Sequence, residues 1–305
     1  MKILVVGIGG IGGFFGGFLY ESGADVTFLV RPKRKKIVSE NGLKIISSLG
    51  NIHIQPNLIL ADELKPIYDV VLISCKTFDL KQALNDLSAV KGKGIIIPFL
   101  NGIKHFQMLD KTFGAENVMG GLAIISSTLH QDGSIEHFGN LRQNITFGNR
   151  DNKKNNILLP FYEICKKSKF DVTLSEQINL DLWKKWVFIS AVAGATTLFG
   201  CSLGDIVKND FGEKILSDLY EECRLIAESY GYIIEDKEAK NIVKSITIPG
   251  SPIKASMQRD VEKNAFTEHE EIFGHLISKA QNYNFNSPIL TLCYLKMKLY
   301  KEKLT

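Results

Sequence analysis

The stretch that decides the fold is KILVVGIGGIGGFFGGFLYES, residues 2–22. The apolar segment Lys2–Val6 predicts a buried strand, and the run that ends at Ser22 predicts a helix. Between them stand Gly7, Ile8, Gly9, Gly10, Ile11 and Gly12, in the spacing G-x-G-x-x-G. The first glycine permits a tight turn, the second lets backbone approach a pyrophosphate, and the third lets the helix lie close to the strand. Strand, turn and helix in this order predict a dinucleotide site at the helix N-terminus, with a loop that only turns the chain as the alternative.

Short apolar runs alternate with helical stretches as far as residue 171, which predicts a parallel sheet with crossover helices. The expected strands are Lys2–Val6, Asp25–Val30, Val70–Cys75, Gly94–Phe99 and Val118–Ile125. Several of these runs lack alternation, as strands buried on both faces do. Gly42–Ser48 and Asn51–Ile54 do alternate and predict an inserted hairpin, and Ser134–Phe147 predicts further extended pairing at the sheet margin.

After Phe170 the pattern changes to long helices. The expected helical segments are Asn179–Phe199, Phe211–Tyr230, Lys237–Ser245, a stretch after Pro252, Thr267–Asn282 and Pro288–Lys303. The fold class predicted is therefore α/β, an N-terminal Rossmann doubly wound sheet followed by an all-helical C-terminal domain. We expect residues 1–171 to bind the dinucleotide and residues 172–305 to carry substrate and catalysis.

Composition narrows the function classes. The 305 residues are 45% hydrophobic, and 37 basic against 33 acidic residues leave a net charge of +4. This charge is too mild to predict a nucleic-acid partner, and it suits a small anionic ligand better. Five cysteines stand far apart without C-x-x-C spacing, which predicts a cytoplasmic protein without a metal site. We expect no membrane partner, and a homodimer stays open.

Two segments resemble sequences that target a protein to a membrane or cross one. Met1–Leu19 resembles a signal peptide, but its glycine spacing and the strand pattern that follows favour a folded domain. Trp186–Gly204 is 19 residues long without a charge, near the length that crosses a bilayer. Its glycine, serine and threonine content and the lack of a second such span favour a buried central helix.

The second expected strand indicates which dinucleotide is bound. An NAD site needs Asp or Glu at the end of this strand, whereas a 2′-phosphate needs Arg. The strand ends at Val30 and is followed by Arg31 and the basic run Lys33–Lys36, while Asp25 stands at the opposite end. A solvated charge run is the alternative for Lys33–Lys36, but Arg31 stands where bidentate phosphate recognition is needed. The sequence predicts NADP(H).

Residues with special chemistry follow other expected strands. Lys76 follows Val70–Cys75, and Asn101 with Gly102 follows Gly94–Phe99. Ligands bind beyond the carboxyl ends of strands in open α/β sheets, so Gly7, Arg31, Lys76 and Asn101 are expected on one rim. Chance surface residues would explain any one of them alone.

The helix expected from Asn179 carries a lysine among apolar residues. Lys185 shares a face with Leu182, Ile189 and Ala193. Burying the charge of a lysine on such a helix costs free energy, so its presence needs an explanation. Snorkelling to the surface is one explanation. The other is a desolvated ammonium with a lowered pKa that protonates a carbonyl oxygen as hydride arrives.

Taken together, these residues resemble the ketopantoate reductase (2-dehydropantoate 2-reductase) family along essentially the whole chain. The likeness rests on the glycine motif, Arg31, Lys76, Asn101-Gly102, Leu182-Trp183-Lys184-Lys185, Ser256-Met257-Gln258-Arg259-Asp260 and Thr267-Glu268. Members bind NADPH in the cleft between a Rossmann domain and a helical domain and reduce ketopantoate to pantoate for pantothenate and coenzyme A synthesis. The resemblance implies the same reaction here.

Residue roles follow from the same resemblance. It implies that Lys185 is the proton donor and that Arg31 holds the 2′-phosphate. Lys76 and Asn101 would line nicotinamide and substrate, Ser256 would contact the substrate carboxylate, and Glu268 would meet the substrate hydroxyl and the cofactor. Two of these residues have structural alternatives, because Ser256 could be a helix N-cap and Glu268 lies within a Thr267–Glu270 capping-box spacing.

The sequence departs from the family at two positions. Members place Asn one and two turns after the catalytic lysine, where this chain has Ile189 and Ala193. Losing hydrogen-bonding groups changes substrate discrimination. The chain could therefore reduce another small branched 2-oxo acid, or be a non-catalytic NADP-binding homologue. A 3-hydroxyacyl or hydroxyisobutyrate type of dehydrogenase is a further alternative, although its cofactor strand more often ends in an acid.

Overall fold

The computed structural model describes residues 1–138, 143–151 and 155–304. The chain forms two compact units, Met1–Leu100 with His105–Asn179, and Asn101–Lys104 with Leu180–Thr305. The boundary expected after residue 171 falls inside the first unit, because strand β12 (Asp171–Leu174) pairs with β11 (Asn144–Gly148) there.

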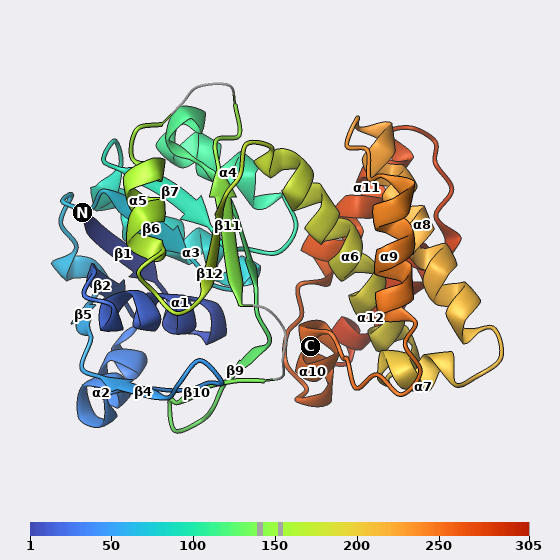
Figure 1. Ribbon diagram of the computed structural model, residues 1–305, viewed down its shortest axis with the longest axis horizontal. Coiled ribbons are helices and arrows are strands. Elements are labelled where there is room, and N and C mark those ends of the chain that lie inside the picture. Colours follow the sequence, from blue (N-terminus) through green and yellow to red (C-terminus); the bar gives the residue numbers. More distant parts are fainter. Residues whose placement is uncertain (139–142, 152–154, 305) are drawn as a thin grey trace. The chain divides into compact units, whose positions relative to one another are not determined.

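The first unit is built on a five-stranded parallel sheet (Figure 1), as the sequence predicts. Its strand order is β5 (Asn57–Ile59), β2 (Asp25–Leu29), β1 (Lys2–Val6), β6 (Val70–Ile73) and β7 (Ile95–Pro98). The central strand β1 is buried from Ile3 to Val6, since both of its edges are paired and helices cover its faces. The edge strand β5 was not predicted, because its three residues carry little pattern.

Helix α1 (Gly10–Glu21) packs against two sheets at once. A Cβ added at Gly16 would lie 2.7 Å from the Phe28 ring of β2, and one added at Gly17 would lie 2.5 Å from Ile45 of β3 (Leu43–Ile46). The glycine-rich sequence of this helix therefore lets two layers close on it, while Phe14 and Phe18 fill the core around it.

Two smaller sheets complete the first unit. The expected hairpin is present as β3 and β4 (Ile52–Ile54), which continue through β10 (Ile135–His137) to β9 (Ser127–Leu129). The third sheet has the order β12-β11-β8. Strand β8 (Gly120–Ile124) was expected in the parallel sheet, but it pairs antiparallel with β11, and only a bridge from Ile96 to Val118 reaches β7.

The expected stretch Ser134–Phe147 divides between these sheets rather than forming one sheet margin. Its first part becomes β10 and its last part β11, while residues 139–142 lie outside the described part of the chain. The remaining α-helices of this unit are α2 (Pro32–Asn41), α3 (Leu80–Asp86), α4 (His105–Phe113) and α5 (Leu158–Cys165).

The second unit consists of helices in its described residues, as predicted. They are α6 (Ile178–Phe199), α7 (Leu203–Val207), α8 (Gly212–Ser229), α9 (Asp236–Ile246), α10 (Ser256–Glu262), α11 (His275–Gln281) and α12 (Pro288–Glu302). The first residues of α6 belong to the other unit. Trp186, Val187 and Ala191 of α6 are buried in the apolar core, which confirms the expected buried helix.

Two details of this unit differ from expectation. The stretch Thr267–Asn282 is not one α-helix, because a π-helix at Glu270–Gly274 precedes α11. The short α7 was not predicted; the Ser202 hydroxyl accepts the backbone N–H of Asp205 and caps its N-terminus. None of the helices formed by the described residues combines the length and the apolar character needed to cross a membrane.

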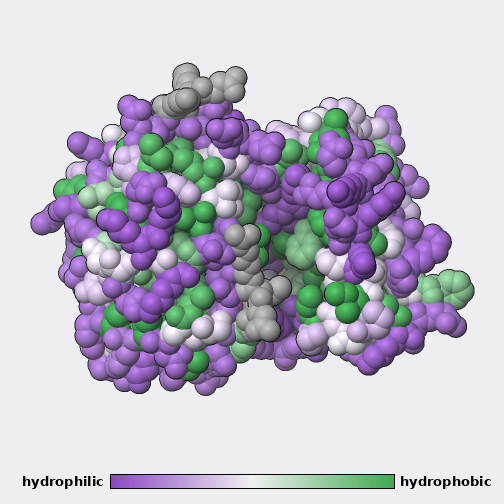
Figure 2. Space-filling view, in the orientation of Figure 1, coloured by the Kyte–Doolittle hydropathy of each residue, from purple (hydrophilic) through white to green (hydrophobic). Residues whose placement is uncertain are grey.

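Polar and charged residues cover most of the face of each unit seen in Figure 2, with apolar residues scattered among them. This distribution is ordinary for a folded domain surface, where isolated apolar side chains are common.

Candidate active site

The glycine loop of the first unit has the geometry that its sequence predicts. Gly7 adopts φ +93°, a conformation that L side chains rarely take, and its N–H donates to the Leu29 carbonyl of β2. The Ser74 hydroxyl donates to the Val6 carbonyl at 3.0 Å. The loop is thus tied to the strands on both sides of β1, which fixes its path at the carboxyl edge of the sheet.

The other two motif glycines differ in the space around them. A Cβ on Gly12 would lie 2.0 Å from the Ser74 hydroxyl and 2.3 Å from the Gly7 carbonyl oxygen, so only glycine lets α1 lie this close to the loop. A Cβ on Gly9 would meet nothing within 4 Å. Gly9 is the N-cap of α1 and has no side chain to cap it. Open space therefore lies over the end of α1 where its first N–H groups need an acceptor.

Arg31 follows β2 and is the N-cap residue of α2. Its Nη2 donates to Asp79 Oδ1 at 2.7 Å, and the two side chains are 63% and 34% exposed. The hydrogen bond that Arg31 donates to Asp79 raises the pKa of Arg31. Asp79 lies after β6, so the pair links segments that follow the two neighbours of β1. No carboxylate stands at this end of β2 in the sequence, and Asp79 was not predicted as a partner of Arg31, because the two residues are 48 positions apart.

Lys76 lies where the sequence places it. The residue is half-buried, follows β6, and is the N-cap of a one-turn 3-10 helix at Thr77–Asp79. Since β2, β1 and β6 are adjacent and parallel, Arg31, Gly7 and Lys76 come from the same edge of one sheet.

Lys185 lies on α6 in the second unit. Leu182 and Trp186 nearby on this helix are buried, and Ile189, one turn further on, is half-buried. Part of the Lys185 side chain stays exposed. Burial lowers the pKa of Lys185 to about 8, and the negative charge of Glu268 acts in the opposite direction. The residue thus has the property expected of a lysine that exchanges a proton near neutral pH.

Glu268 is the carboxylate beside this lysine, and it is only 7% exposed. The side-chain amide of Asn101 donates to Glu268 Oε2 at 3.2 Å. Gly102, at φ +73°, lets the loop approach closely, since a Cβ there would lie 2.9 Å from the Glu271 carbonyl oxygen. Lys104 Nζ lies 3.7 Å from Glu271 Oε1. The segment Asn101–Lys104 therefore packs within the second unit and brings two predicted site residues, Asn101 and Glu268, into contact.

The π-helix after Glu268 is tied to α6. The indole N–H of Trp186 donates to the Ile272 carbonyl at 2.9 Å, and the Ser190 hydroxyl donates to the same oxygen at 3.4 Å. A π-helix frees carbonyl groups from the regular helical ladder and often marks a functional site. These two donors hold the segment that carries Glu268 against the helix that carries Lys185. Neither donor was predicted from the sequence, since a Trp on an apolar helix has the pattern of a core residue.

Ser256 is the first residue of α10 and is exposed. The N-cap is Ala255, so the alternative that Ser256 only caps the helix is wrong. The Ala255 N–H donates to the Thr196 hydroxyl of α6 at 3.4 Å, which anchors the start of α10. The capping-box alternative at Thr267 gains no support either, since the Thr267 hydroxyl pairs with His269 Nδ1 at 2.8 Å.

Ile189 and Ala193 lie one and two turns after Lys185. Ala193 is 3% exposed and belongs to the apolar core, while Ile189 packs at its margin. No polar side chain replaces the expected Asn at either position. The side chains one and two turns after Lys185 are therefore apolar.

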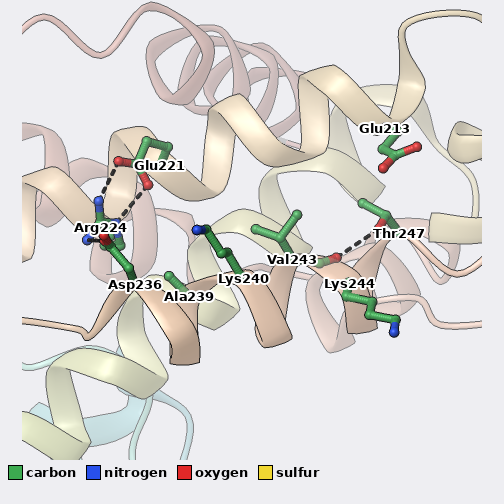
Figure 3. Close-up of a pocket in the computed structure, with 9 residues that line it drawn as sticks. All are labelled: Glu213, Glu221, Arg224, Asp236, Ala239, Lys240, Val243, Lys244 and Thr247. Carbon is green, nitrogen blue, oxygen red and sulfur yellow. Dashed lines mark hydrogen bonds and ion pairs between the residues drawn. The ribbon is translucent and has the colours of Figure 1, made fainter.

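A hollow of about 470 Å³ between α8 and α9 contains none of the predicted site residues (Figure 3). Arg224 lines it and donates to Glu221 and to Glu228, at 2.7 and 2.6 Å. Its guanidinium is thus already paired with carboxylates of the same helix, α8.

Comparison with known proteins gives matches along most of the chain. The family model described as "Ketopantoate reductase PanE/ApbA" matches residues 3–152, and the model of the corresponding C-terminal domain matches residues 177–301. An uncharacterized oxidoreductase of Bacillus subtilis, YkpB, is 36% identical over 99% of this chain and 100% of its own length.

Solved structures share the fold. A 2-dehydropantoate 2-reductase from Methylococcus capsulatus is 26% identical with a TM-score of 0.88, covering 100% of this chain and 98% of that one. A ternary complex of D-mandelate dehydrogenase with NADH and anilino(oxo)acetate is 20% identical with a TM-score of 0.90, covering 100% and 99% of the two chains. The chain belongs to the ketopantoate reductase family, whose members are oxidoreductases that act on the CH–OH group of 2-hydroxy acids.

Proposed function

We propose that this protein is a 2-dehydropantoate 2-reductase, an NADPH-dependent enzyme that reduces ketopantoate to pantoate. The observation that carries the proposal is the environment of Lys185, a lysine on a mostly buried helix whose pKa is lowered to about 8 and whose neighbouring carboxylate is Glu268. A structural lysine that snorkels to water would keep a pKa near its ordinary value.

The first unit has residues that fit a phosphorylated dinucleotide. The loop Gly7–Gly12 leaves open space over Gly9, where a pyrophosphate could approach the backbone. Arg31 would hold the 2′-phosphate, and Lys76, Asn101 and Glu268 would contact the rest of the cofactor. When bound, NADPH supplies the hydride that reduces the carbonyl carbon.

The second unit would supply the proton. The Lys185 ammonium donates it to the carbonyl oxygen of the 2-oxo acid, and the lowered pKa makes this donation easier near neutral pH. Glu268, bonded to Asn101, would accept a hydrogen bond from a substrate hydroxyl. Ser256 is exposed at the start of α10 and would contact the substrate carboxylate.

A related substrate is the second candidate, and the apolar side chains of Ile189 and Ala193 on α6 favour it. Ile189 and Ala193 offer no hydrogen bond to the hydroxyl of ketopantoate. A branched 2-oxo acid without that hydroxyl would therefore lose less binding free energy at this site. Reaction type, cofactor and the role of Lys185 would be the same.

The deciding experiment follows NADPH oxidation with a panel of 2-oxo acids, with ketopantoate first and NADH as the alternative cofactor. We expect the highest kcat/KM with ketopantoate and NADPH. A higher value for an unhydroxylated branched 2-oxo acid would favour the second candidate. NADPH binding without turnover of any panel member would contradict the proposal and indicate a non-catalytic homologue.

A further inference from the structure

The proposed ligand of the cofactor 2′-phosphate, Arg31, forms an ion pair with the carboxylate of Asp79. Arg31 Nη2 lies 2.7 Å from Asp79 Oδ1. Asp86 also acts on Arg31 electrostatically, more weakly than Asp79. A phosphate held by the same guanidinium would share one cation with a carboxylate, and two anions this close repel each other.

Two other cations of this basic run, Arg34 and Lys35, are already bound to partners of their own. Arg34 donates to the Gly133 carbonyl at 2.9 Å, and Lys35 pairs with Glu63 at 2.6 Å. Both are thus engaged within the first unit, while Arg31 is the residue at the strand end. Its partner Asp79 therefore decides how much of its charge is available to a ligand.

The same carboxylate suits the other dinucleotide. An acid at the adenosine end of the sheet accepts hydrogen bonds from the ribose hydroxyls of NAD, whereas it opposes a 2′-phosphate. In this chain the acid comes from the segment after β6 rather than from the end of β2, where such residues are usually sought.

From this geometry we infer that Asp79 is a specificity-determining residue, which competes with the cofactor 2′-phosphate for Arg31 and so reduces the preference for NADPH over NADH. The inference rests on the proposed function, because it assumes that Arg31 meets the 2′-phosphate. It concerns binding, so it can be tested without a substrate.

The test measures the Kd of NADPH and of NADH by calorimetry, at low ionic strength, for the wild type and for Asp79→Asn. The pair is exposed, so a modest effect is expected, roughly a two- to fivefold lower Kd for NADPH without tighter binding of NADH. Glu63→Gln is the matched control, since it removes one negative charge from another cation of α2 and leaves Arg31–Asp79 intact. We expect this control to leave the ratio of the two Kd values unchanged.

A double-mutant cycle separates competition for Arg31 from plain repulsion. In an Arg31→Gln background, Asp79→Asn should no longer tighten NADPH binding, and an equal gain there would overturn the inference. Weaker NADPH binding by Asp79→Asn would overturn it too, because it would mean that Asp79 orders Arg31 for the phosphate.

The outcomes also separate this inference from the proposed function. If the wild type binds NADPH and Asp79→Asn leaves both Kd values unchanged, only the inference is refuted. Failure to bind either dinucleotide would refute the proposed cofactor with it.

Discussion

At the scale of single residues, the proposed chemistry depends on how the surroundings of Lys185 set its pKa. Burial favours the neutral amine and Glu268 favours the ammonium, with burial the larger effect, and the result is a pKa of about 8. A general acid works best when its pKa lies near the working pH, because it is then both protonated and able to give up its proton.

This balance predicts the pH dependence of the reaction. In the proposed mechanism the ammonium is the active form, so kcat/KM should be constant below about pH 8 and fall about tenfold per pH unit above it. In Glu268→Gln the charge that raises the pKa of Lys185 is gone, so the falling limb should move to lower pH. Rates measured across pH with saturating NADPH would show this.

Glu270→Gln serves as the control for that shift. Glu270 is close in sequence, but its carboxylate accepts the Tyr294 hydroxyl at 2.8 Å and does not figure among the influences on Lys185. Its falling limb should stay in place. If the falling limb of the pH profile stayed in place in Glu268→Gln, or moved equally in both variants, Glu268 would not control the pKa of Lys185.

Single residues were predictable from sequence where a local pattern fixes their place. Arg31 and Lys76 directly follow strands, and Lys185 interrupts an apolar helix, so each could be found without coordinates. Asp79 and Trp186 could not be assigned in the same way, because their partners are 48 and 86 positions away in the chain. Such pairings depend on how the elements pack.

At the scale of elements, the junction of β1 and α1 illustrates two different uses of glycine. Gly9→Ala should leave the free energy of unfolding nearly unchanged, since its Cβ meets open space and its φ of −102° suits alanine. The same Cβ should raise the Kd of NADPH, because it would occupy the approach to the pyrophosphate.

Gly12→Ala should behave in the opposite way at this junction. Its Cβ would overlap the Ser74 hydroxyl and the Gly7 carbonyl, which should cost about 1–3 kcal/mol of unfolding free energy by overpacking. Denaturant unfolding and NADPH titration of both variants check the pair of expectations. Equal stability of the two variants would contradict the packing described for α1.

The contact between α6 and the π-helix gives a second test at this scale. Trp186→Phe keeps an aromatic ring but removes the donor to the Ile272 carbonyl, so it should cost about 1 kcal/mol of stability or somewhat more. It should also lower kcat/KM, because the segment that carries Glu268 loses an anchor on α6. The measurements are denaturant unfolding and steady-state kinetics.

Trp183→Phe is the matched control, since the chain has two tryptophans and both lie on α6. Trp183 is stacked between Tyr230 and Tyr232, with ring centroids 5.4 and 5.1 Å away, in the aromatic part of the core. Its replacement should affect stability more than the kinetics. If Trp183→Phe lowered kcat/KM as much as Trp186→Phe, the anchoring role would be wrong.

Elements were predictable to the extent that their periodicity is local. Hydrophobic pattern alone predicts four strands of the parallel sheet, β2, β1, β6 and β7. It also predicts the long helices of the second unit. The pattern could not show that β8 leaves the parallel sheet to pair with β11, because pairing partners are not written in a strand's own sequence. Nor could it show the π-helix inside Thr267–Asn282.

At the scale of the whole molecule, one chain combines two kinds of unit, one with sheets and helices and one of helices. The change from alternating strands and helices to long helices predicted this composition, and the two family models divide the chain in the same order. The packing adds that Asn101–Lys104 belongs with the helices although it follows a strand of the sheet. In the proposed function the first unit binds the dinucleotide and Lys185 of the second unit gives the proton.

The most direct test of this account is Lys185→Ala, assayed for kcat and, separately, for NADPH affinity. Positioned general acids contribute about 10²- to 10⁴-fold in rate, so kcat should fall by that order while the Kd of NADPH stays close to that of the wild type. A fall in kcat smaller than about tenfold would contradict the account, because the proton would then come from another group.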